Sequence, residues 1–224
     1  MHIIQKLVNN LYPDSQYGYR NERGTIYGIF TVRQLMEKSR EQCCNLYIAF
    51  IDFTKAFDTV NRPLLFKLLS KIGCPPNLLK TTQLLYSEVK ARLVIEGKLN
   101  PFNYDCKLAP TLYGLYATMV LWITFKDNIE HSVYVHFGTD GNIFDLEKLK
   151  AKTKTFNMYI REAQYADDIT IFSDSSESQQ SLLTSYHLAA KRFGLQINAK
   201  KTEVMRLGPE CDFFVDETKL VRPF

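Results

Sequence analysis

The chain has 224 residues and a formal net charge of +4, from 28 Lys and Arg against 24 Asp and Glu. Hydrophobic residues make up 46% and charged residues 23%, a globular composition that excludes a disordered tail, a collagen-like fibre and a disulfide-rich miniprotein. The mild positive charge permits a polyanionic partner but does not by itself indicate one.

Cysteine usage and hydropathy favour a protein of the cytoplasm or nucleus that is not secreted. The five cysteines are odd in number and have neither Cys-x-x-Cys spacing nor a nearby pair of histidines, which disfavours structural zinc and a disulfide framework. The N-terminal residues lack an apolar run of signal-peptide length. The most apolar stretch, 109–125, falls short of the roughly 20 residues that a bilayer span needs, so we expect a buried helix and no membrane contact.

The first segment with helical periodicity runs from Thr25 to Lys38. We expect Arg33 and Lys38 to face solvent, and the apolar residues at helical spacing are Ile26, Ile29, Phe30 and Met36. Residues 46–53 then form an apolar and aromatic run too short for a typical helix, which predicts a buried strand. Asp52 lies at the end of that strand, where a carboxylate is unusual.

Capping and turn signals divide the middle of the chain. Asn61 is expected to cap a helix that has Pro63 in its first turn and continues to Gly73. Beyond it we expect a helix at 77–90, a hairpin at 91–104 and a long apolar helix at 109–126. Strands should follow at 131–144, around a turn at 139–142.

An acidic turn dominates the last third of the chain. Two β-prone runs, 159–165 and 169–172, flank Asp167 and Asp168. A helix capped by Ser175 or Ser176 should follow and stop at Gly194, and short strands at 195–197 and 203–207 should close the fold. This order of elements predicts an α+β fold in which helices pack on one face of a mainly antiparallel sheet.

The carboxylates at 52, 167 and 168 suggest metal chemistry. An exposed Asp-Asp turn is the structural alternative for Asp167 and Asp168, because turns favour Asp. If the strand before Asp52 neighbours the strands of the acidic turn, however, three carboxylates converge, and oxygen ligands suit Mg²⁺. Two such ions can bind the attacking and leaving oxygens of a phosphoryl displacement. The residues alone leave nucleotidyl transfer and phosphodiester cleavage both open.

Four ordered segments resemble the motifs of reverse transcriptases, in the form found in LINE-type retrotransposons that lack long terminal repeats. They are QYGYRNERGT at 16–25, FIDFTKAFDTVNR at 50–62, YADD at 165–168 and GLQINAKKTEVM at 194–205. The resemblance extends from about residue 16 to residue 207. It implies a fingers-and-palm fold and RNA-directed DNA polymerase activity, with an RNA template, a DNA primer and deoxynucleoside triphosphates as partners.

The resemblance also implies roles for single residues. Asp52, Asp167 and Asp168 match the carboxylates that hold two Mg²⁺ ions, for which Mn²⁺ can substitute. Phe57 matches the steric gate that presses on the 2′ position of the sugar, although plain core packing is an alternative. Lys201 matches a lysine that lies near the triphosphate and can protonate pyrophosphate. Its register against Lys200 is open, and a solvated surface lysine is the alternative.

Three further residues are candidates for nucleotide or template binding by resemblance. Arg20 and Arg23 could contact phosphates of the template or triphosphate, and exposed loop arginines are the alternative. Tyr165 would lie near the primer end. Alternate lysines over 148–154 either add affinity for a nucleic-acid backbone or form a solvated charged face.

The sequence departs from the family pattern before the long helix. The family usually carries a Gly-x-x-Gln-Gly element there, but residues 101–110 keep only the downstream Leu-Ala-Pro. We expect residues 1–45 to form part of the fingers and residues 46–224 the palm, with a finger insertion at about 75–105 and truncation before the thumb. An active or once active polymerase domain and a catalytically dead remnant that at most binds nucleic acid or metal both remain open. A phosphodiesterase using the same carboxylates has less support.

Overall fold

The computed structural model describes residues 2–20, 22–88, 90–95, 98–103, 109–126, 132–138 and 155–220. The helices are α1 (His2–Asn9), α2 (Thr25–Glu41), α3 (Arg62–Lys71), α4 (Pro76–Glu88), α5 (Ala109–Lys126) and α7 (Ser176–Arg192). The strands are β1 (Leu46–Ile51), β2 (Lys90–Ile95), β3 (Lys98–Asn103), β4 (Val133–Gly138), β5 (Thr155–Ile160), β6 (Glu162–Tyr165), β7 (Asp168–Ser173), β8 (Glu203–Leu207), β9 (Phe214–Val215) and β10 (Thr218–Lys219).

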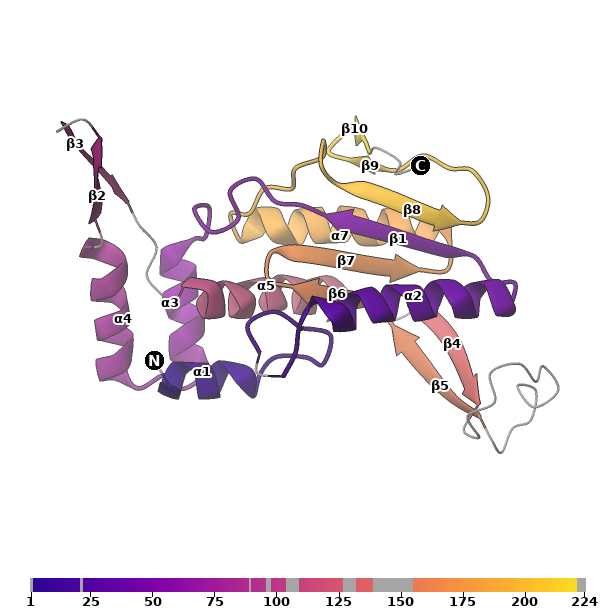
Figure 1. Cartoon of the computed structure of the whole chain (residues 1–224), viewed down its shortest axis with the longest axis horizontal. Coiled ribbons are helices and arrows are strands. Elements are labelled where there is room, and N and C mark those ends of the chain that lie inside the picture. The colour runs from indigo at the N-terminus through magenta and orange to yellow at the C-terminus, as the bar shows by residue number, and fades with distance from the viewer. Residues whose placement is uncertain are drawn as a thin grey trace.

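A four-stranded antiparallel sheet in the order β6-β7-β1-β8 forms the centre of the molecule (Figure 1). In β1, Ile51 lies opposite Ile169 of β7, and Phe50 lies opposite Glu203 of β8. The three segments predicted as strands around Asp52, the acidic turn and residues 203–207 are therefore neighbours. The α+β prediction is confirmed. The strand before Asp52 also neighbours a strand of the acidic turn, which was the condition for the three carboxylates to converge.

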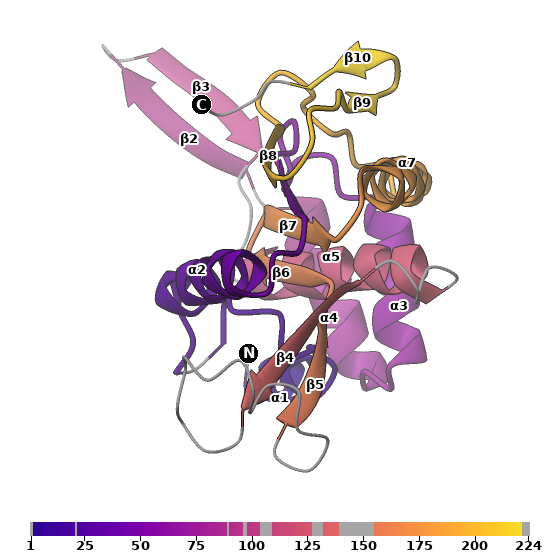
Figure 2. The ribbon, with the colours of Figure 1, turned by 90° about the vertical axis from the view of Figure 1, so that its right-hand side faces the viewer.

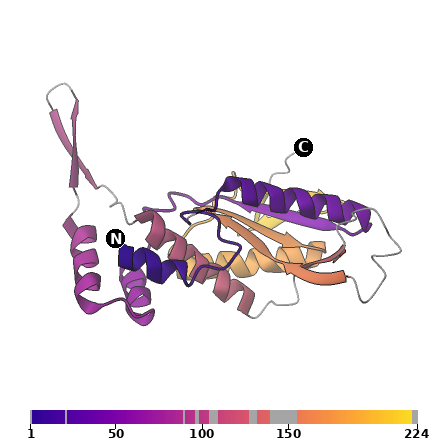
Figure 3. The same cartoon turned by 60° about the horizontal axis from the view of Figure 1, so that its bottom comes forward.

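Alternation along β1 separates two cores. Tyr47, Ala49 and Ile51 belong to a large cluster with α5 and α7, whereas Leu46 and Ile48 belong to a smaller cluster with α2 on the opposite face. Figure 2 shows α7 on one side of the sheet and α2 on the other, and Figure 3 shows α5 and α7 together below it. The predicted helical layer on one face corresponds to α5 and α7, and α2 covers part of the second face in addition.

Local capping signals predicted two helix starts correctly. The Asn61 side chain accepts a hydrogen bond from the backbone nitrogen of Leu64, 3.1 Å away, at the start of α3. Ser175 accepts one from the backbone nitrogen of Ser178, 3.2 Å away, at the start of α7. Each cap satisfies a backbone donor that the first helical turn leaves without a partner.

The long apolar segment is the buried helix that the sequence predicts. Tyr12 Oη donates to the carbonyl oxygen of Thr111 at 2.8 Å, which ties the first turn of α5 to the N-terminal segment. One turn later, the Tyr116 hydroxyl donates to the carbonyl oxygen of Phe193 and accepts from the backbone nitrogen of Asn61. Within the residues described above, no helix is both long and apolar enough to cross a membrane.

The predicted orientation of α2 is wrong for three of its four apolar residues and for Lys38, whereas Met36 packs on the core and Arg33 is exposed, as expected. Ile26, Ile29 and Phe30 are 78%, 64% and 60% exposed, whereas Lys38 is buried and pairs with Glu41 at 2.7 Å. The helix instead packs on the sheet through a stripe one turn further along, which contains Val32, Leu35, Met36 and Ser39. These residues have the i, i+3, i+4, i+7 spacing of a single helix face.

Two strand predictions also change. Residues 195–197 contribute only an isolated bridge, between Phe53 and Ile197. β4 fills the first half of the predicted 131–144 pair, but its partner is β5. The predicted turn at 139–142 and the lysine-rich run at 148–154 lie outside the described residues.

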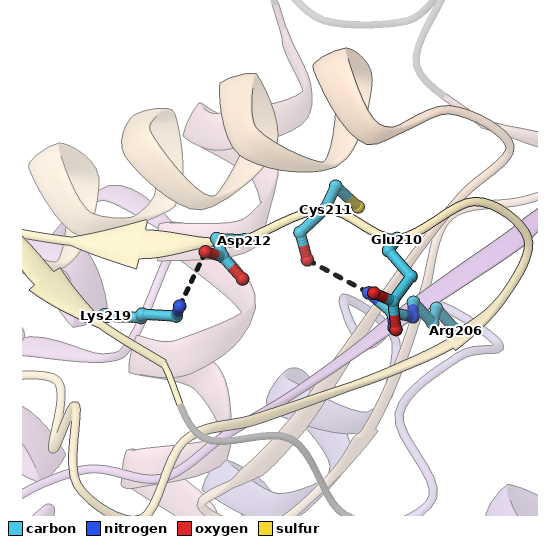
Figure 4. Close-up of polar contacts among 5 residues, drawn as sticks. All are labelled: Arg206, Glu210, Cys211, Asp212 and Lys219. Atoms are coloured by element: carbon cyan, nitrogen blue, oxygen red, sulfur yellow. Dashed lines mark hydrogen bonds and ion pairs between the residues drawn. The ribbon is translucent and has the colours of Figure 1, made fainter.

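A small hairpin of β9 and β10 follows the sheet and is joined to it by polar contacts (Figure 4). Arg206 of β8 donates to the carbonyl oxygen of Cys211 at 3.2 Å and pairs with Glu210. Lys219 Nζ lies 2.6 Å from Asp212 Oδ2. At the other end of the molecule, α4 and the β2–β3 hairpin extend away from the sheet (Figures 1 and 3). This is the segment predicted as a finger insertion.

We predict that Gly114→Ala destabilises the fold by about 1–3 kcal/mol through overpacking. A Cβ at Gly114 would lie 2.5 Å from Tyr12 Oη, which is held by its bond to Thr111. Urea denaturation measures the change. The double variant with Tyr12→Phe removes the closest atom, so its cost should be smaller than the sum of the two single changes. Strict additivity would contradict this account.

Candidate active site

The register of β1 and β7 brings the predicted carboxylates together. Asp52 follows Ile51, the last paired residue of β1, so it stands across from Asp168, the residue that precedes Ile169. Asp167 occupies the tight turn between β6 and β7, in which Tyr165 pairs with Asp168. All three carboxylates therefore lie at one end of the sheet.

The backbone of Asp52 is held by the segment that resembles the fourth motif. Its carbonyl oxygen accepts from the backbone nitrogen of Asn198 at 2.8 Å, and its backbone nitrogen donates to Thr202 Oγ1 at 3.3 Å. Thr202 is fully buried. These contacts fix the position of the Asp52 backbone, from which the side chain extends.

The same segment places one lysine at the site. Lys201 Nζ lies 3.9 Å from Asp52 Oδ2. Lys200 instead lines a separate cavity of about 620 Å³, beside Lys191 and Asp216. The geometry thus distinguishes the two lysines whose register the sequence left open, and Lys201 is the one beside the carboxylates.

The acidic turn is braced from outside by the segment at 15–18. The backbone nitrogen of Tyr17 donates to the carbonyl oxygen of Gln164, and the backbone nitrogen of Gln164 donates to the carbonyl oxygen of Ser15, both at 2.8 Å. Ala166 has a φ of 60°, a left-handed conformation that costs a non-glycine residue about 1–2 kcal/mol. A Cβ at Gly18 would lie only 2.3 Å from the backbone nitrogen of Ala166, so glycine permits the two segments to touch.

The pKa of Asp168 is raised by its surroundings. Partial burial raises the pKa of Asp168, and the charges of Asp167 and then Asp52 raise it further. Burial followed by the charge of Asp167 also raises the pKa of Tyr19, whose hydroxyl therefore stays protonated beside the turn. Asp52 Oδ2 is shielded from solvent and has no hydrogen-bond partner, with the Lys201 ammonium 3.9 Å away. The site is a concentration of negative charge that a cation would relieve.

The donor chemistry fits a hard divalent cation. The three side chains offer carboxylate oxygens alone, and one buried oxygen lacks a partner. In the described ranges, no three His, Cys, Asp or Glu side chains are already close enough to form a metal-binding group. The three aspartates share one end of the sheet, and their carboxylates would have to draw closer around an ion.

Phe57 packs against α5. Its ring centroid is 4.7 Å from that of Tyr113, at an interplanar angle of 42°. Phe57 is partly buried and packs on the large core. Its core contact is therefore real, and its contact with a sugar stays a prediction.

The three remaining predicted residues have structural contacts in this conformation. Arg20 donates to the carbonyl oxygens of Pro13 at 2.8 Å and Gln16 at 3.3 Å. Arg23 lies 3.7 Å from Asp14 and 5.3 Å from the Tyr27 ring centroid. Tyr165 is 38% exposed. It borders a groove of about 520 Å³ between α2 and the sheet, which also reaches Asp168.

Sequence reasoning missed several residues that hold the site. Three of them, Gly18, Asn198 and Thr202, lie inside the segments that resemble reverse transcriptase motifs. The resemblance therefore pointed to these segments, but it did not identify the contacts that the three residues make. Tyr113 had no signal beyond its place in an apolar helix. Burial raises the pKa of its hydroxyl, and the charges of Asp167, Asp168 and Asp52 raise it further.

Comparison with known proteins identifies the family. Residues 1–219 match the family described as reverse transcriptase (RNA-dependent DNA polymerase). The chain belongs to the reverse transcriptase family.

Its relatives are distant. The chain is 22% identical over 198 residues to the retrovirus-related Pol polyprotein from type-1 retrotransposable element R2 of Bradysia coprophila, a match that covers 88% of this chain and 21% of the relative. Among solved structures it resembles apo telomerase from Candida tropicalis truncated from the C-terminal domain, with a TM-score of 0.59, 16% identity and coverage of 95% of this chain and 41% of that one. It also resembles telomerase from Candida albicans in complex with a TWJ fragment of telomeric RNA, with a TM-score of 0.61, 11% identity and coverage of 91% and 34%. These structural likenesses confirm the reverse transcriptase fold of fingers and palm.

We predict that Gly18→Ala destabilises the protein by about 1–3 kcal/mol, because the new methyl group meets backbone rather than a movable side chain. Gly24→Ala is the matched control. It lies six residues along the same loop, and a Cβ there meets nothing within 4 Å. Thermal unfolding of both variants tests the contact. Equal melting temperatures would contradict the close approach of Gly18 to Ala166.

Proposed function

We propose that this chain is an RNA-directed DNA polymerase domain that extends a DNA primer on an RNA template from deoxynucleoside triphosphates. One observation supports this most. In a chain of the reverse transcriptase family, the β1–β7 register sets Asp52 across from Asp168, with Lys201 beside Asp52. A polymerase with these partners would work in the cytoplasm or nucleus.

The metal-binding residues would be Asp52, Asp167 and Asp168, which would hold two Mg²⁺ or Mn²⁺ ions. Bound ions of this kind activate the attacking hydroxyl and neutralise charge on the leaving group. The chain's own contribution is to orient the carboxylates, through the backbone bonds at Asp52 and the support of the turn by Gly18. The YADD turn and two-metal nucleotidyl transfer belong to this proposal.

Other side chains would bind and orient the substrates. Lys201, whose Nζ lies 3.9 Å from Asp52 Oδ2, would hold the triphosphate and give its ammonium proton to the leaving pyrophosphate. Phe57 would exclude a 2′-hydroxyl, and Tyr165 would lie near the primer end. Arg20 and Arg23 would contact phosphates of the template or triphosphate. To do so, Arg20 would give up its bond to the carbonyl oxygen of Pro13, and Arg23 would give up its ion pair with Asp14.

The domain division is part of the same proposal. Residues 1–45 would belong to the fingers and 46–224 to the palm, with the α4–β2–β3 segment as the finger insertion. The match spans about a fifth of the retrotransposon polyprotein's length, so a longer protein could supply further contacts to template and primer.

A non-catalytic domain is the second candidate, favoured by one feature of the sequence. The Gly-x-x-Gln-Gly element is missing before α5, and residues 104–108 lie outside the described ranges. In the family this element lies against template and nucleotide. A misplacement of about 1 Å in such a site can cost on the order of a hundredfold in rate.

Primer extension on an RNA template with Mg²⁺ separates the two candidates. The wild-type chain should incorporate deoxynucleotides, and the variant with Asp167→Ala and Asp168→Ala should lose incorporation by on the order of a thousandfold or more, since several kcal/mol of charge stabilisation is removed. No incorporation by folded wild-type protein would favour the non-catalytic domain. Strand cleavage without incorporation would favour a phosphodiesterase.

A lysine pair tests the assignment of the general acid. Lys201→Gln should lower the incorporation rate by about a hundredfold, as loss of a positioned acid does. Lys200→Gln is the matched control, because its side chain lines the separate cavity, and it should change the rate by less than about threefold. Single-turnover rates with saturating nucleotide measure both. Equal losses would contradict the special position of Lys201.

A further inference from the structure

Gln164, the third residue of β6, places a buried side-chain amide beside the acidic turn. The residue is 0% exposed. Its Nε2 donates to the carbonyl oxygen of Ala166 at 3.3 Å, and its Oε1 accepts from Thr118 Oγ1 at 3.5 Å. Burying an amide destabilises the folded state unless both of its ends are hydrogen-bonded, and an apolar side chain would avoid that requirement. The two bonds therefore give this position a use for a polar residue.

The first bond acts on the peptide group that leads into Asp167. The carbonyl oxygen of Ala166 and the backbone nitrogen of Asp167 belong to one planar unit, so a bond to the oxygen fixes the direction in which the chain enters Asp167. Ala166 has a φ of 60°. A non-glycine residue keeps this strained conformation only where its surroundings hold it. The Gln164 side chain is thus one of the contacts that hold the turn in place.

The second bond orients the amide. Only the NH₂ end of a glutamine side chain can donate, and only its oxygen can accept. The Thr118 hydroxyl donates to Oε1, which leaves Nε2 directed at Ala166. Thr118 is 8% exposed and lies in the middle of α5. Two hydrogen bonds in series therefore connect the core helix α5 to the acidic turn.

We propose that Gln164 is a positioning residue of the carboxylate site. Oriented by Thr118, its amide fixes the peptide between Ala166 and Asp167, and so the point from which the Asp167 carboxylate reaches a divalent cation. The inference rests on the proposed function for the presence of that cation. Residues that orient metal ligands in this way typically contribute about 10- to 100-fold to metal affinity.

Two variants break the connection at different points. Gln164→Met keeps a side chain of similar length but removes both hydrogen bonds, which leaves the Ala166 carbonyl without this donor. Thr118→Val removes only the hydroxyl that orients the amide. Because both act through the same two bonds, the double variant should lose no more affinity than Gln164→Met alone.

Two residues of α7 provide matched controls. Gln179 is also 0% exposed, but neither end of its amide has a hydrogen-bond partner, so Gln179→Met removes a buried amide without breaking a bond. Ser175 caps α7 through its bond to the backbone nitrogen of Ser178, and Ser175→Ala should destabilise the fold. Ser175 follows the end of β7 that lies away from Asp168, so it separates a general loss of stability from a loss of positioning.

The experiment is calorimetric titration of the full chain with Mn²⁺, beside urea denaturation without metal, for the wild type and the variants. Gln164→Met should weaken Mn²⁺ binding by about 10-fold or more, and Thr118→Val should weaken it by a smaller factor. Both control variants should change the affinity by less than about 2-fold, although Ser175→Ala should shift the urea midpoint downwards.

Unchanged Mn²⁺ affinity in Gln164→Met would overturn the inference, whatever the primer-extension assay gives. Equal affinity losses in Gln164→Met and Ser175→Ala would overturn it as well, because they would trace to general destabilisation. A wild-type chain that binds no Mn²⁺ would overturn it together with the metal site of the proposed function. Conversely, Mn²⁺ binding that depends on Gln164 in a chain that incorporates no nucleotide would support this inference and contradict the proposed polymerase.

Discussion

The pairing of β1 with β7 is the constraint on which the site depends. Because these strands are antiparallel with Ile51 opposite Ile169, the residues just beyond that pair must face each other, and both are aspartates. Like charges at the same sheet edge oppose folding, as the raised pKa of Asp168 indicates. The apolar pairs along the rest of β1 and β7 hold the carboxylates together against this repulsion.

Support for this arrangement comes from segments distant in sequence. The loop before β8 bonds to both backbone groups of Asp52, and the loop after α1 bonds to the strand that enters the acidic turn. The close contact of Gly18 with Ala166 joins the second of these loops to the turn itself. The acidic turn, with left-handed backbone at Ala166, is thus held by the surrounding fold rather than by its own four residues.

Elements with strong local signals could be predicted from the sequence. Asn61 and Ser175 cap the helices that they were expected to cap, and the apolar run at 109–126 forms α5. The three carboxylates stood out because each followed or preceded an apolar strand. The register of one sheet then brought them together.

Features that depend on tertiary packing could not be predicted. The apolar stripe of α2 was assigned to Ile26, Ile29, Phe30 and Met36, but the sheet accepts the stripe around Leu35, which includes only Met36 of these four. Both stripes have helical spacing, and only the position of the sheet decides between them. Tyr113 likewise looks like any aromatic residue of a core helix, and its contact with Phe57 follows from how α5 packs.

The match over residues 1–219 shows the family, and the structural likenesses at 11–16% identity show the fold, whereas chemistry must be argued from the site. This chain has three aspartates at one end of the sheet, Lys201 beside Asp52, and buried contacts that position the Asp52 backbone. It departs from the family in the element before α5, where template and nucleotide would be held. The distinction between metal binding and nucleotide positioning is therefore the physical question that this protein poses.

The most direct test of the central claim is anomalous diffraction from crystals grown with Mn²⁺. The account predicts a Mn²⁺ peak at the end of the sheet, ligated by Asp52 Oδ2 and by the carboxylates of the acidic turn, with ligand distances of roughly 2.0–2.3 Å. Asp52→Asn should remove or greatly weaken the peak. Mn²⁺ bound only elsewhere, with Asp52 Oδ2 still without a ligand, would contradict the claim that the β1–β7 register builds a divalent-cation site.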